Sequence, residues 1–432
     1  MIIYKKNKII MAEIEATSKL LNYAMNSKRA TASRSIRVKQ PCVNGDEFNG
    51  TQQIIFRLPS NVRNTFLDGE TVYLNMNVSV DVNCNVEGSC GAYGFIDRIE
   101  ILSSGQTLMS LDGYAELLSL FADLECSSQG KDNRYKLMCG LGSDRFTGTA
   151  IASANYSKFS LPLHLTLFQS MAHYLPLFSR DALEIRITLN SNDKAIVAAA
   201  ASVWTIWSPE LVYYQVEVND NAMTMINENC GGVYSLNCKD FRHTRFAVPA
   251  TANGGGVVNT LGFSMSSLES MLVAVIPTAN NVLSKPSNSN RTTFLGNDGE
   301  FNLTLNGERI PSRLIKGSPA ETMAEIAIRE RTLGTFYHPS SINGDANTFN
   351  VNDGAGSSSA TTGSYFLCVD LESMRPQSSD EMYAGVSTVG GVLQSEIKAG
   401  VAIPASYIHY FAQNTINLTL DMNGSQTWVV SV

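Results

Sequence analysis

Apolar and polar residues alternate over twelve positions between Thr71 and Val82. Successive side chains of a β-strand point to opposite faces, so this alternation predicts a strand with one face in a core and the other toward solvent. Further strand-like runs in the first half of the chain are separated by clusters of Ser, Asn, Gly and Asp, as in all-β sandwiches. These runs cover residues 53–58, 95–102, 106–111, 159–167, 183–189 and 211–218.

The second half of the chain is equally rich in strand-like runs. They cover residues 233–236, 245–248, 271–276, 300–305, 308–314, 365–371, 392–397, 408–412, 416–421 and 427–432. Few helical patterns interrupt them, so the sequence predicts an all-β chain with short inserted helices. Two polar stretches, 280–297 and 343–363, are predicted to be long surface loops.

One combination of elements occurs twice along the chain. Strands on both sides of the turn Ser104-Gly105 are followed by a helical pattern at residues 112–125. Strands on both sides of the turn Asn306-Gly307 are followed by a helical pattern at residues 319–331. The second helix begins with a capping box and a proline at its first position, formed by Ser318, Pro319 and Glu321.

The spacing and order of these elements indicate an internal duplication. The two turns lie 202 residues apart, and the strands that follow each helix come in the same order. The sequence therefore predicts two fused copies of one β-sandwich, with the boundary between residues 219 and 233.

Positive charge is concentrated at the N-terminus. The chain has a net charge of −7 at pH 7, but residues 1–40 hold nine Lys or Arg and two Glu, a net charge of +7. Segment 28–39 contains no acidic residue and five basic ones: Lys28, Arg29, Arg34, Arg37 and Lys39. Its Ala, Ser and Thr content predicts a mobile arm, preceded by a short amphipathic helix at about residues 12–28. Such an arm can bind the phosphates of nucleic acid or an anionic membrane, or it can become ordered against a neighbouring subunit.

The composition limits the class of protein. Of 432 residues, 44% are apolar and only 16% are charged, below the roughly 25% that is usual in soluble domains. The surface is therefore either unusually uncharged or buried against other subunits. No apolar run reaches the roughly 18 residues of a membrane-spanning helix. No signal-peptide pattern follows the first lysines, so folding in a reducing compartment is expected.

No arrangement of residues points to catalysis or to a cofactor. The five histidines, at positions 164, 173, 243, 338 and 409, lack metal-ligand spacing. The glycines at 254–256 are not followed by the Lys and Ser or Thr of a phosphate-binding loop. Asp97 and Glu100 lie three positions apart on one predicted strand, which places them on opposite faces. The sequence therefore predicts no enzyme activity, no metal site and no cofactor.

Two stretches of the chain resemble a known family, the double jelly-roll major capsid proteins of the tectivirus and adenovirus lineage. The strand, hairpin and helix of their first jelly roll are similar to residues 94–124, GFIDRIEILSSGQTLMSLDGYAELLSLFADL. Their paired strands joined by a Pro-containing turn resemble residues 159–168, FSLPLHLTLF, and 174–189, YLPLFSRDALEIRITL. The resemblance covers about residues 49–432 and consists of hydrophobic patterns without a catalytic signature.

The resemblance implies an all-β chain of two fused eight-stranded jelly rolls, at residues 46–225 and 226–432, behind an N-terminal arm at residues 1–45. It implies a homotrimer whose six jelly rolls form a pseudo-hexameric capsomer in the shell of a non-tailed icosahedral virus. Neighbouring capsomers, penton proteins and minor capsid proteins are the implied partners. The long loops would face outward, and the protein would fold in the host cytoplasm or nucleus before it enters the virion.

The same resemblance assigns a place to the basic arm. It would lie at the inner face of the shell and contact the genome or the headgroups of an internal membrane. The implied contact residues are Lys28, Arg29, Arg34, Arg37 and Lys39.

A carbohydrate-binding or adhesive β-sandwich protein, such as a spike or a lectin-like module, is the alternative interpretation. It would present exposed Trp or Tyr on a concave patch. The clustered tryptophans Trp204 and Trp207 lie in an apolar, strand-like context, which predicts a core or an interface. A β-sandwich hydrolase would need a nucleophile, a base or a metal set that the sequence lacks.

Overall fold

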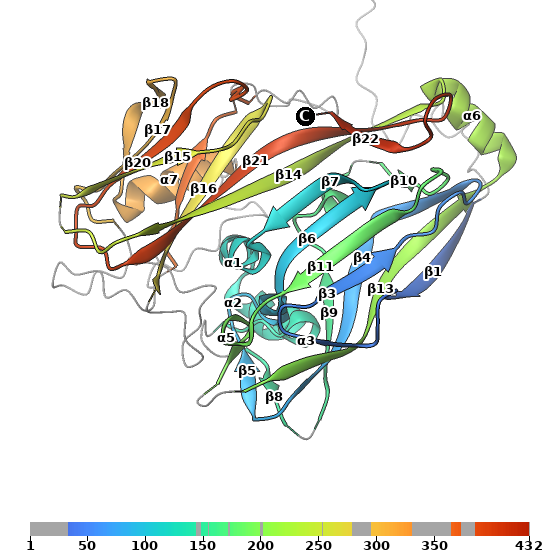
Figure 1. Cartoon of the computed structure of the whole chain (residues 1–432), viewed down its shortest axis with the longest axis horizontal. Helices are drawn as coiled ribbons and strands as arrows, with labels where there is room; N and C mark the ends of the chain where they lie inside the picture. Colours follow the sequence, from blue (N-terminus) through green and yellow to red (C-terminus); the bar gives the residue numbers. More distant parts are fainter. Residues whose placement is uncertain are drawn as a thin grey trace, which may run out of the picture.

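The chain forms two β-sandwiches of eight main strands each (Figure 1). A computed structural model describes residues 33–431, except 144–147, 154, 172, 199–201, 253, 279–294, 331–363 and 373–384. Most of the two predicted long loops, and the predicted helix at residues 12–28, lie outside the described residues.

The first sandwich consists of two facing four-stranded sheets. One sheet has the order β1 (Ser33–Pro41), β13 (Trp204–Val218), β4 (Thr65–Val80) and β9 (Ser157–Pro162). The other has the order β3 (Gln53–Arg57), β11 (Leu183–Leu189), β6 (Ile96–Ser103) and β7 (Gln106–Asp112). This strand order, in two facing sheets with Greek-key connections, is that of a jelly roll.

The second sandwich repeats this order strand for strand. Its first sheet is β14 (Val233–Val248), β21 (Ser406–Asp421), β16 (Leu268–Pro277) and β19 (Leu367–Asp370). Its second sheet is β15 (Gly256–Leu261), β20 (Leu393–Lys398), β17 (Glu300–Leu305) and β18 (Glu308–Lys316). The predicted duplication and the predicted all-β, double jelly-roll fold class are therefore confirmed.

Short strands, helices and turns lie between the main strands of the first jelly roll and link it to the second. The short strands are β2 (Glu47–Asn49), β5 (Cys84–Val86), β8 (Ala150–Ile151), β10 (Leu175–Pro176) and β12 (Ile196–Val197). The helices are α1 (Tyr114–Glu125), α2 (Ser128–Gly130), α3 (Lys136–Cys139), α4 (Leu167–Ser170), α5 (Asn192–Ala195) and α6 (Asp220–Cys230). A 3₁₀ turn at Ala92–Phe95 and a π-type turn at Lys131–Tyr135 complete the set. Helix α6 lies between β13 and β14, inside the predicted boundary range.

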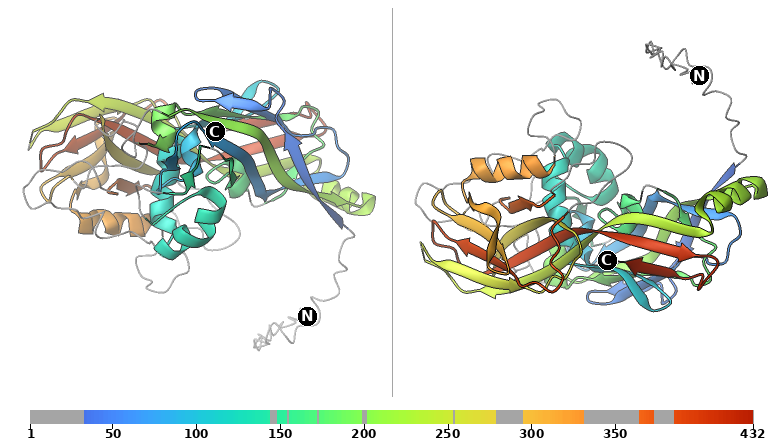
Figure 2. Two further views of the ribbon diagram at one scale, coloured as in Figure 1. Left: turned by 90° about the horizontal axis from the view of Figure 1, so that it is seen from below. Right: turned by 90° about the horizontal axis from the view of Figure 1, so that it is seen from above.

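The second jelly roll carries helix α7 (Pro319–Arg329) after β18, in the position that α1 has after β7. Both helices project on the same side of the molecule, α1 in teal and α7 in orange (Figure 2). At the C-terminus, β22 (Trp428–Ser431) pairs with β21. The ribbon of β14, β21 and β22 extends across the first jelly roll and contacts β7 (Figure 1).

Strand β4 shows how the alternation produces the sandwich. Val72, Leu74, Met76 and Val78 are almost fully buried inside the first jelly roll, and Tyr73, Asn75 and Asn77 between them are half-exposed on its outer face. The strand begins at Thr65 and ends at Val80, so Val82 lies beyond it and is 41% exposed. Burial of such residues in both jelly rolls creates one continuous apolar core.

The two predicted hairpins have the same turn geometry. Ser104 and Gly105 have φ angles of 50° and 80°, and Asn306 and Gly307 have φ angles of 53° and 86°. Two consecutive residues with positive φ make the turn whose twist matches that of the flanking strands. Gly is favoured there because it has no Cβ to clash, and Asn because its short polar side chain can hydrogen-bond the local backbone.

The capping box of α7 is only half formed. The Ser318 hydroxyl accepts a hydrogen bond from the Glu321 backbone N–H, as predicted, at 3.4 Å. The Glu321 carboxylate, however, accepts from the Lys316 backbone N–H at 3.0 Å. It therefore fixes the end of β18 instead of returning to the backbone of Ser318.

Three predicted strand boundaries are wrong. The run at 159–167 ends as a strand at Pro162, because Leu165 adopts a positive φ of 61° and α4 begins at Leu167. The pairs of runs at 233–236 and 245–248, and at 408–412 and 416–421, are single strands. Strands β14 and β21 pair over sixteen consecutive positions, and this continuous ladder carries both through their polar middle residues.

The predicted arm at residues 1–45 is too long. Residues 33–41 form β1, which pairs with β13 at all nine positions, so the first jelly roll begins at Ser33 and not at residue 46. Ile36 and Val38 alternate with Arg37 and Lys39, and this period-2 pattern favours strand pairing despite the positive charge. No helix in the described part of the chain is both long and apolar enough to cross a membrane.

We expect that G105A and G307A each lower the free energy of unfolding by about 1–2 kcal/mol, since Ala is strained at positive φ. The added Cβ would have no atom within 4 Å at either position, so steric overlap does not contribute. The matched control is G256A, where the site is equally open and φ is not positive. Urea unfolding checks this, and an equal loss in G256A would contradict the explanation.

Candidate functional site

The five predicted contact residues divide into two groups. Lys28 and Arg29 lie outside the described residues, and Arg34 is exposed near the start of β1. Arg37 donates a hydrogen bond from Nη2 to the Tyr73 hydroxyl at 2.7 Å. The Lys39 ammonium lies 3.2 Å from the Glu210 carboxylate. Arg37 and Lys39 are thus engaged on the outer face of the first sheet.

That outer face, on β1, β13, β4 and β9, carries mainly uncharged polar and aromatic side chains. Ser160 donates to the Asn75 side chain at 2.7 Å, and the Trp207 indole donates to the Ser79 hydroxyl at 2.9 Å. These side chains are half-exposed, and hydrogen bonds to their neighbours hold them in place. Aromatic and uncharged polar side chains, with Arg37, Lys39 and Glu210 toward the β1 edge, are typical of a protein interface that has a polar rim.

The equivalent outer face of the second jelly roll is buried. On β14, β21 and β16 it presents Phe241, Phe411 and Leu272, which are at most 4% exposed. The first jelly roll covers this face with helices α1 and α4, and strand β7 packs against β14 beside them. The rings of Phe121 on α1 and Phe241 meet edge to face at 5.8 Å, and the Arg329 guanidinium lies 5.2 Å from the centre of the Phe121 ring. We call this contact the joint between the jelly rolls.

Charged groups are enclosed in the joint and near it. Glu116 on α1 is 4% exposed, and its carboxylate lies 3.5 Å from the Lys194 ammonium. Burial opposes the charge of Glu116, but Lys194 and the nearby imidazoles hold the pKa of its carboxyl below the usual value. Burial raises the pKa of Asp240 to about 6, although Arg242 contacts it at 2.7 Å. The surroundings of these groups are therefore set by packing of one jelly roll on the other.

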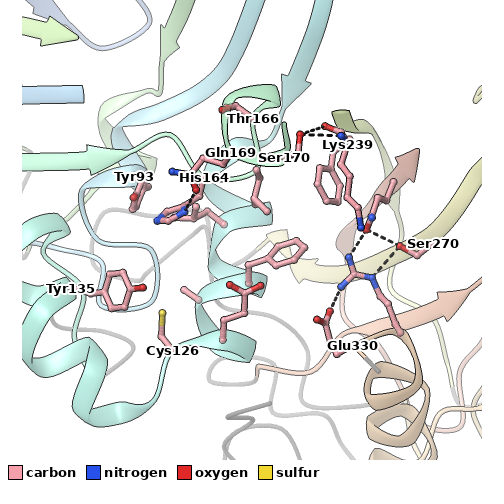
Figure 3. A pocket seen from close by; sticks show the side chains of 18 of the residues that line it. Tyr93, Cys126, Tyr135, His164, Thr166, Gln169, Ser170, Lys239, Ser270 and Glu330 are labelled. Atoms are coloured by element: carbon pink, nitrogen blue, oxygen red, sulfur yellow. Dashed lines mark hydrogen bonds and ion pairs between the residues drawn. The ribbon is translucent and has the colours of Figure 1, made fainter. Parts of the chain in front are cut away.

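A cavity of about 540 Å³ borders the joint (Figure 3). Its walls come from both jelly rolls, with Phe121 and His164 on one side and Lys239 and Arg329 on the other. Arg329 donates to Ser270 at 3.0 Å and to Gln413 at 2.5 Å, so it is held by the second jelly roll.

The cavity has no arrangement suited to catalysis among the described residues. The His164 imidazole hydrogen-bonds the Gln169 side chain at 2.8 Å, and burial lowers its pKa. Burial raises the pKa of the Cys126 thiol, so this thiol stays protonated and is a poor nucleophile at neutral pH. In the described part of the chain, no group of three or more His, Cys, Asp or Glu side chains could hold a metal ion.

The joint was missed by reasoning from the sequence, although one signal points to it. Every position of β16 is buried, and its sequence LESMLVAVIP has apolar residues at both parities from Met271 onward. A strand with two apolar faces must be covered on both sides. The sequence does not say which segment supplies the second cover, because that depends on the packing of α1.

Comparisons with known proteins agree with this architecture. VP54 of PBCV-1, fitted into a reconstruction of the virophage Sputnik, superposes with a TM-score of 0.62 at 12% identity, over 94% of this chain and 98% of its own. The Sputnik virophage structure superposes with a TM-score of 0.61 at 11% identity, over 100% of this chain and 93% of its own. The mavirus major capsid protein superposes with a TM-score of 0.53 at 13% identity, over 97% of this chain and 95% of its own.

The chain has the double jelly-roll fold of viral major capsid proteins. No protein-family model matches it, and no curated protein matches its sequence. In this double jelly roll, the two copies are joined by burial of a sheet of the second copy against helices α1 and α4 and strand β7 of the first. The fold is therefore preserved where sequence identity has fallen to about one residue in eight.

We expect F241A to lower the free energy of unfolding by about 3 kcal/mol, because truncation of a buried Phe leaves a void. Phe241 is 4% exposed and borders the cavity, which places the loss at the lower end of the usual range. Urea unfolding measures the change. The control is L137A, at a site that is 86% exposed, and a comparable loss there would contradict the importance of the joint.

Proposed function

We propose that this chain is the major capsid subunit of a non-tailed icosahedral virus, and that it trimerises into pseudo-hexameric capsomers. One observation carries the proposal. Within the chain, a sheet face of one jelly roll is covered in part by the helix that follows the hairpin of the other. The equivalent face of the first jelly roll and the equivalent helix, α7, lack such a cover within the described residues of one chain.

A second copy of the chain is the natural cover for these surfaces. The joint is a head-to-tail contact between two copies of one fold, and head-to-tail contacts generate rings when the rotation closes. If the next chain repeats the contact, its α7 and β18 pack on the outer face of β1, β13, β4 and β9. Two jelly rolls per chain and three chains then give a ring of six similar units.

The side chains on the two surfaces suit such a contact. The outer face presents Tyr73, Asn75 and Trp207, and the helix and hairpin present half-exposed apolar groups such as Ile310 and Met323. The low proportion of charged residues in the whole chain, 16%, also suits a protein whose sides are packed against neighbours.

The basic arm is proposed to lie at the inner face of the shell. Ser33 pairs with Val218, directly before α6, so the chain N-terminal to β1 starts from the α6 end of the first jelly roll. The DNA or RNA genome and the headgroups of an internal membrane both offer phosphates to Lys28, Arg29 and Arg34. The loops 280–297 and 343–363 are proposed to face outward, as in the resembled family.

Neighbouring capsomers, penton proteins and minor capsid proteins are proposed as the other partners, and the virion as the final location after folding in the host cytoplasm or nucleus. The adhesive or carbohydrate-binding alternative has less support. Trp204 is fully buried, and Trp207 is half-buried on a flat sheet face where its indole already bonds Ser79. The alternative also allows an exposed Tyr, and Tyr156, which is 61% exposed, lies edge to face with the Trp207 ring at 6.3 Å.

The trimer contact is tested by placing a charge on each face of the first jelly roll. Asn75 lies on the face proposed to be covered, and Thr188 lies at a comparable half-buried position on the opposite sheet. We expect N75K to weaken the trimer at least about tenfold, because a charge buried in an interface without a partner is costly. We expect T188K to leave the trimer intact. Sedimentation velocity measures both, and a trimer unaffected by N75K would exclude this surface.

The arm is tested with two sets of neutralising substitutions. We expect K28Q/R29Q/R34Q to lower the slope of log affinity against log salt for double-stranded DNA by up to about 3, one phosphate contact per residue. R37Q/K39Q should have little effect, since Tyr73 and Glu210 already engage these side chains. Fluorescence anisotropy, repeated with vesicles that contain phosphatidylserine, distinguishes the two sources of phosphate. Equal losses in both sets would contradict the assignment.

A further inference from the structure

Two imidazoles meet inside the joint between the jelly rolls. His243 on β14 and His409 on β21 are connected by a hydrogen bond between Nε2 and Nδ1 at 3.1 Å. Their rings stack with centres 5.2 Å apart, and the Phe411 ring stacks on His243 at 4.6 Å. His409 is only 3% exposed. The pair belongs to the second jelly roll and lies on the face that the first jelly roll covers.

The first jelly roll lies directly against this pair. Gly113, the residue before α1, approaches so closely that a Cβ on it would be 3.0 Å from Cε1 of His243. Gly113 has a φ of 65°, which a larger residue rarely adopts. His243 is half-buried, but water reaches the His409 imidazole only if α1 moves away from β14 and β21. Protonation of the pair and separation of the jelly rolls are therefore linked.

The charges that face the pair favour a neutral state. They come from four elements packed around it: Asp112 on β7, Glu116 on α1, Lys194 on α5 and Arg245 on β14. Arg98 is engaged with Asp112 at 3.5 Å. The two carboxylates and the two cations cancel, so no net negative charge offsets a first proton on the pair. A second proton would add a charge that has no partner.

The hydrogen bond itself also opposes full protonation. In the neutral pair one ring nitrogen donates and the other accepts. If both rings are charged, two N–H groups point at each other and the bond is lost. Burial lowers the pKa of His243 to about 4 and the pKa of His409 to about 3. An exposed imidazole has a pKa near 6.5, so the separated state binds protons that the closed state excludes.

The direction of the pH effect follows from these shifts. The pKa of each histidine is lowered in the folded chain, so the stability of the closed joint is fully present above about pH 6.5. It is lost as the pH falls from there toward about 4. Each histidine raises the opening equilibrium about 30-fold between pH 7.5 and pH 5, and the pair raises it up to about 1,000-fold.

We propose that His243 and His409 make the joint sensitive to acid. The contact between the two jelly rolls loosens as the pair takes up two protons. The proposal concerns a contact within one chain, so it holds or fails independently of the trimer. In a shell subunit, such a device would loosen the building block in an acidic compartment and keep it rigid at neutral pH.

Hydrogen exchange of the full-length protein tests the proposal. The readout is the opening equilibrium of residues 114–125 and 406–413 from pH 7.5 to pH 5, corrected for the intrinsic pH dependence of exchange. We expect this equilibrium to rise up to about 1,000-fold more in the wild type than in H243Q/H409Q, whose amides keep a hydrogen bond but do not titrate. Carboxylates such as Asp240 are present in both proteins. Their contribution to the pH dependence therefore cancels when the wild type is compared with the double variant.

Two single variants serve as controls. H173Q replaces an exposed histidine and should behave as the wild type. H164Q removes the buried histidine of the cavity and should retain most of the pH dependence. The same pH dependence in the wild type and in H243Q/H409Q would overturn the proposal.

A second measurement needs no variant, in case the double variant does not fold. Exchange at the imidazole Cε1–H, followed by mass spectrometry, gives the pKa of each histidine in the native wild type. Values below about 5 for His243 and His409 support the proposal, and values near 6.5 overturn it.

Discussion

The burial of both faces of the β14–β21–β16 sheet is the constraint on which the rest of the structure depends. One face forms the core of the second jelly roll, and the other carries Phe241, Phe411 and Leu272. A face of this kind cannot be left to water in a single chain without a large loss of hydrophobic stabilisation. Helices α1 and α4 and strand β7 of the first jelly roll together satisfy the constraint. The two copies of the fold are therefore held in a defined orientation and do not behave as independent domains on a linker.

The same constraint relates the fold to assembly. Duplication supplies each chain with two copies of the helix and two copies of the sheet face, and among the described residues one such pair is in contact within the chain. The remaining face is more polar than its buried counterpart, with Asn75 and Tyr73 where the second copy has apolar residues. A polar, ordered face is compatible with a subunit that is soluble before it assembles.

The sequence was sufficient for elements that local patterns determine. The hairpin turns at Ser104 and Asn306, the strands β11 and β17, and the start of α7 follow from turn chemistry, period-2 alternation and capping. Prediction from the sequence failed where pairing between strands far apart in the chain determines the structure. Sixteen backbone pairs carry β14 through its polar middle, and pairing with β13 converts part of the basic arm into β1. The contact between His243 and His409, 166 residues apart, has no local signature.

The central claim is that the chain builds a closed ring from repeated head-to-tail contacts between jelly rolls. The solution mass of the purified protein, measured by light scattering on a size-exclusion column, with negative-stain imaging of the same peak, tests it most directly. The account predicts a mass near three times 47.0 kDa and a particle of hexagonal outline. A monomer that forms no larger particle at any salt concentration or pH would contradict it.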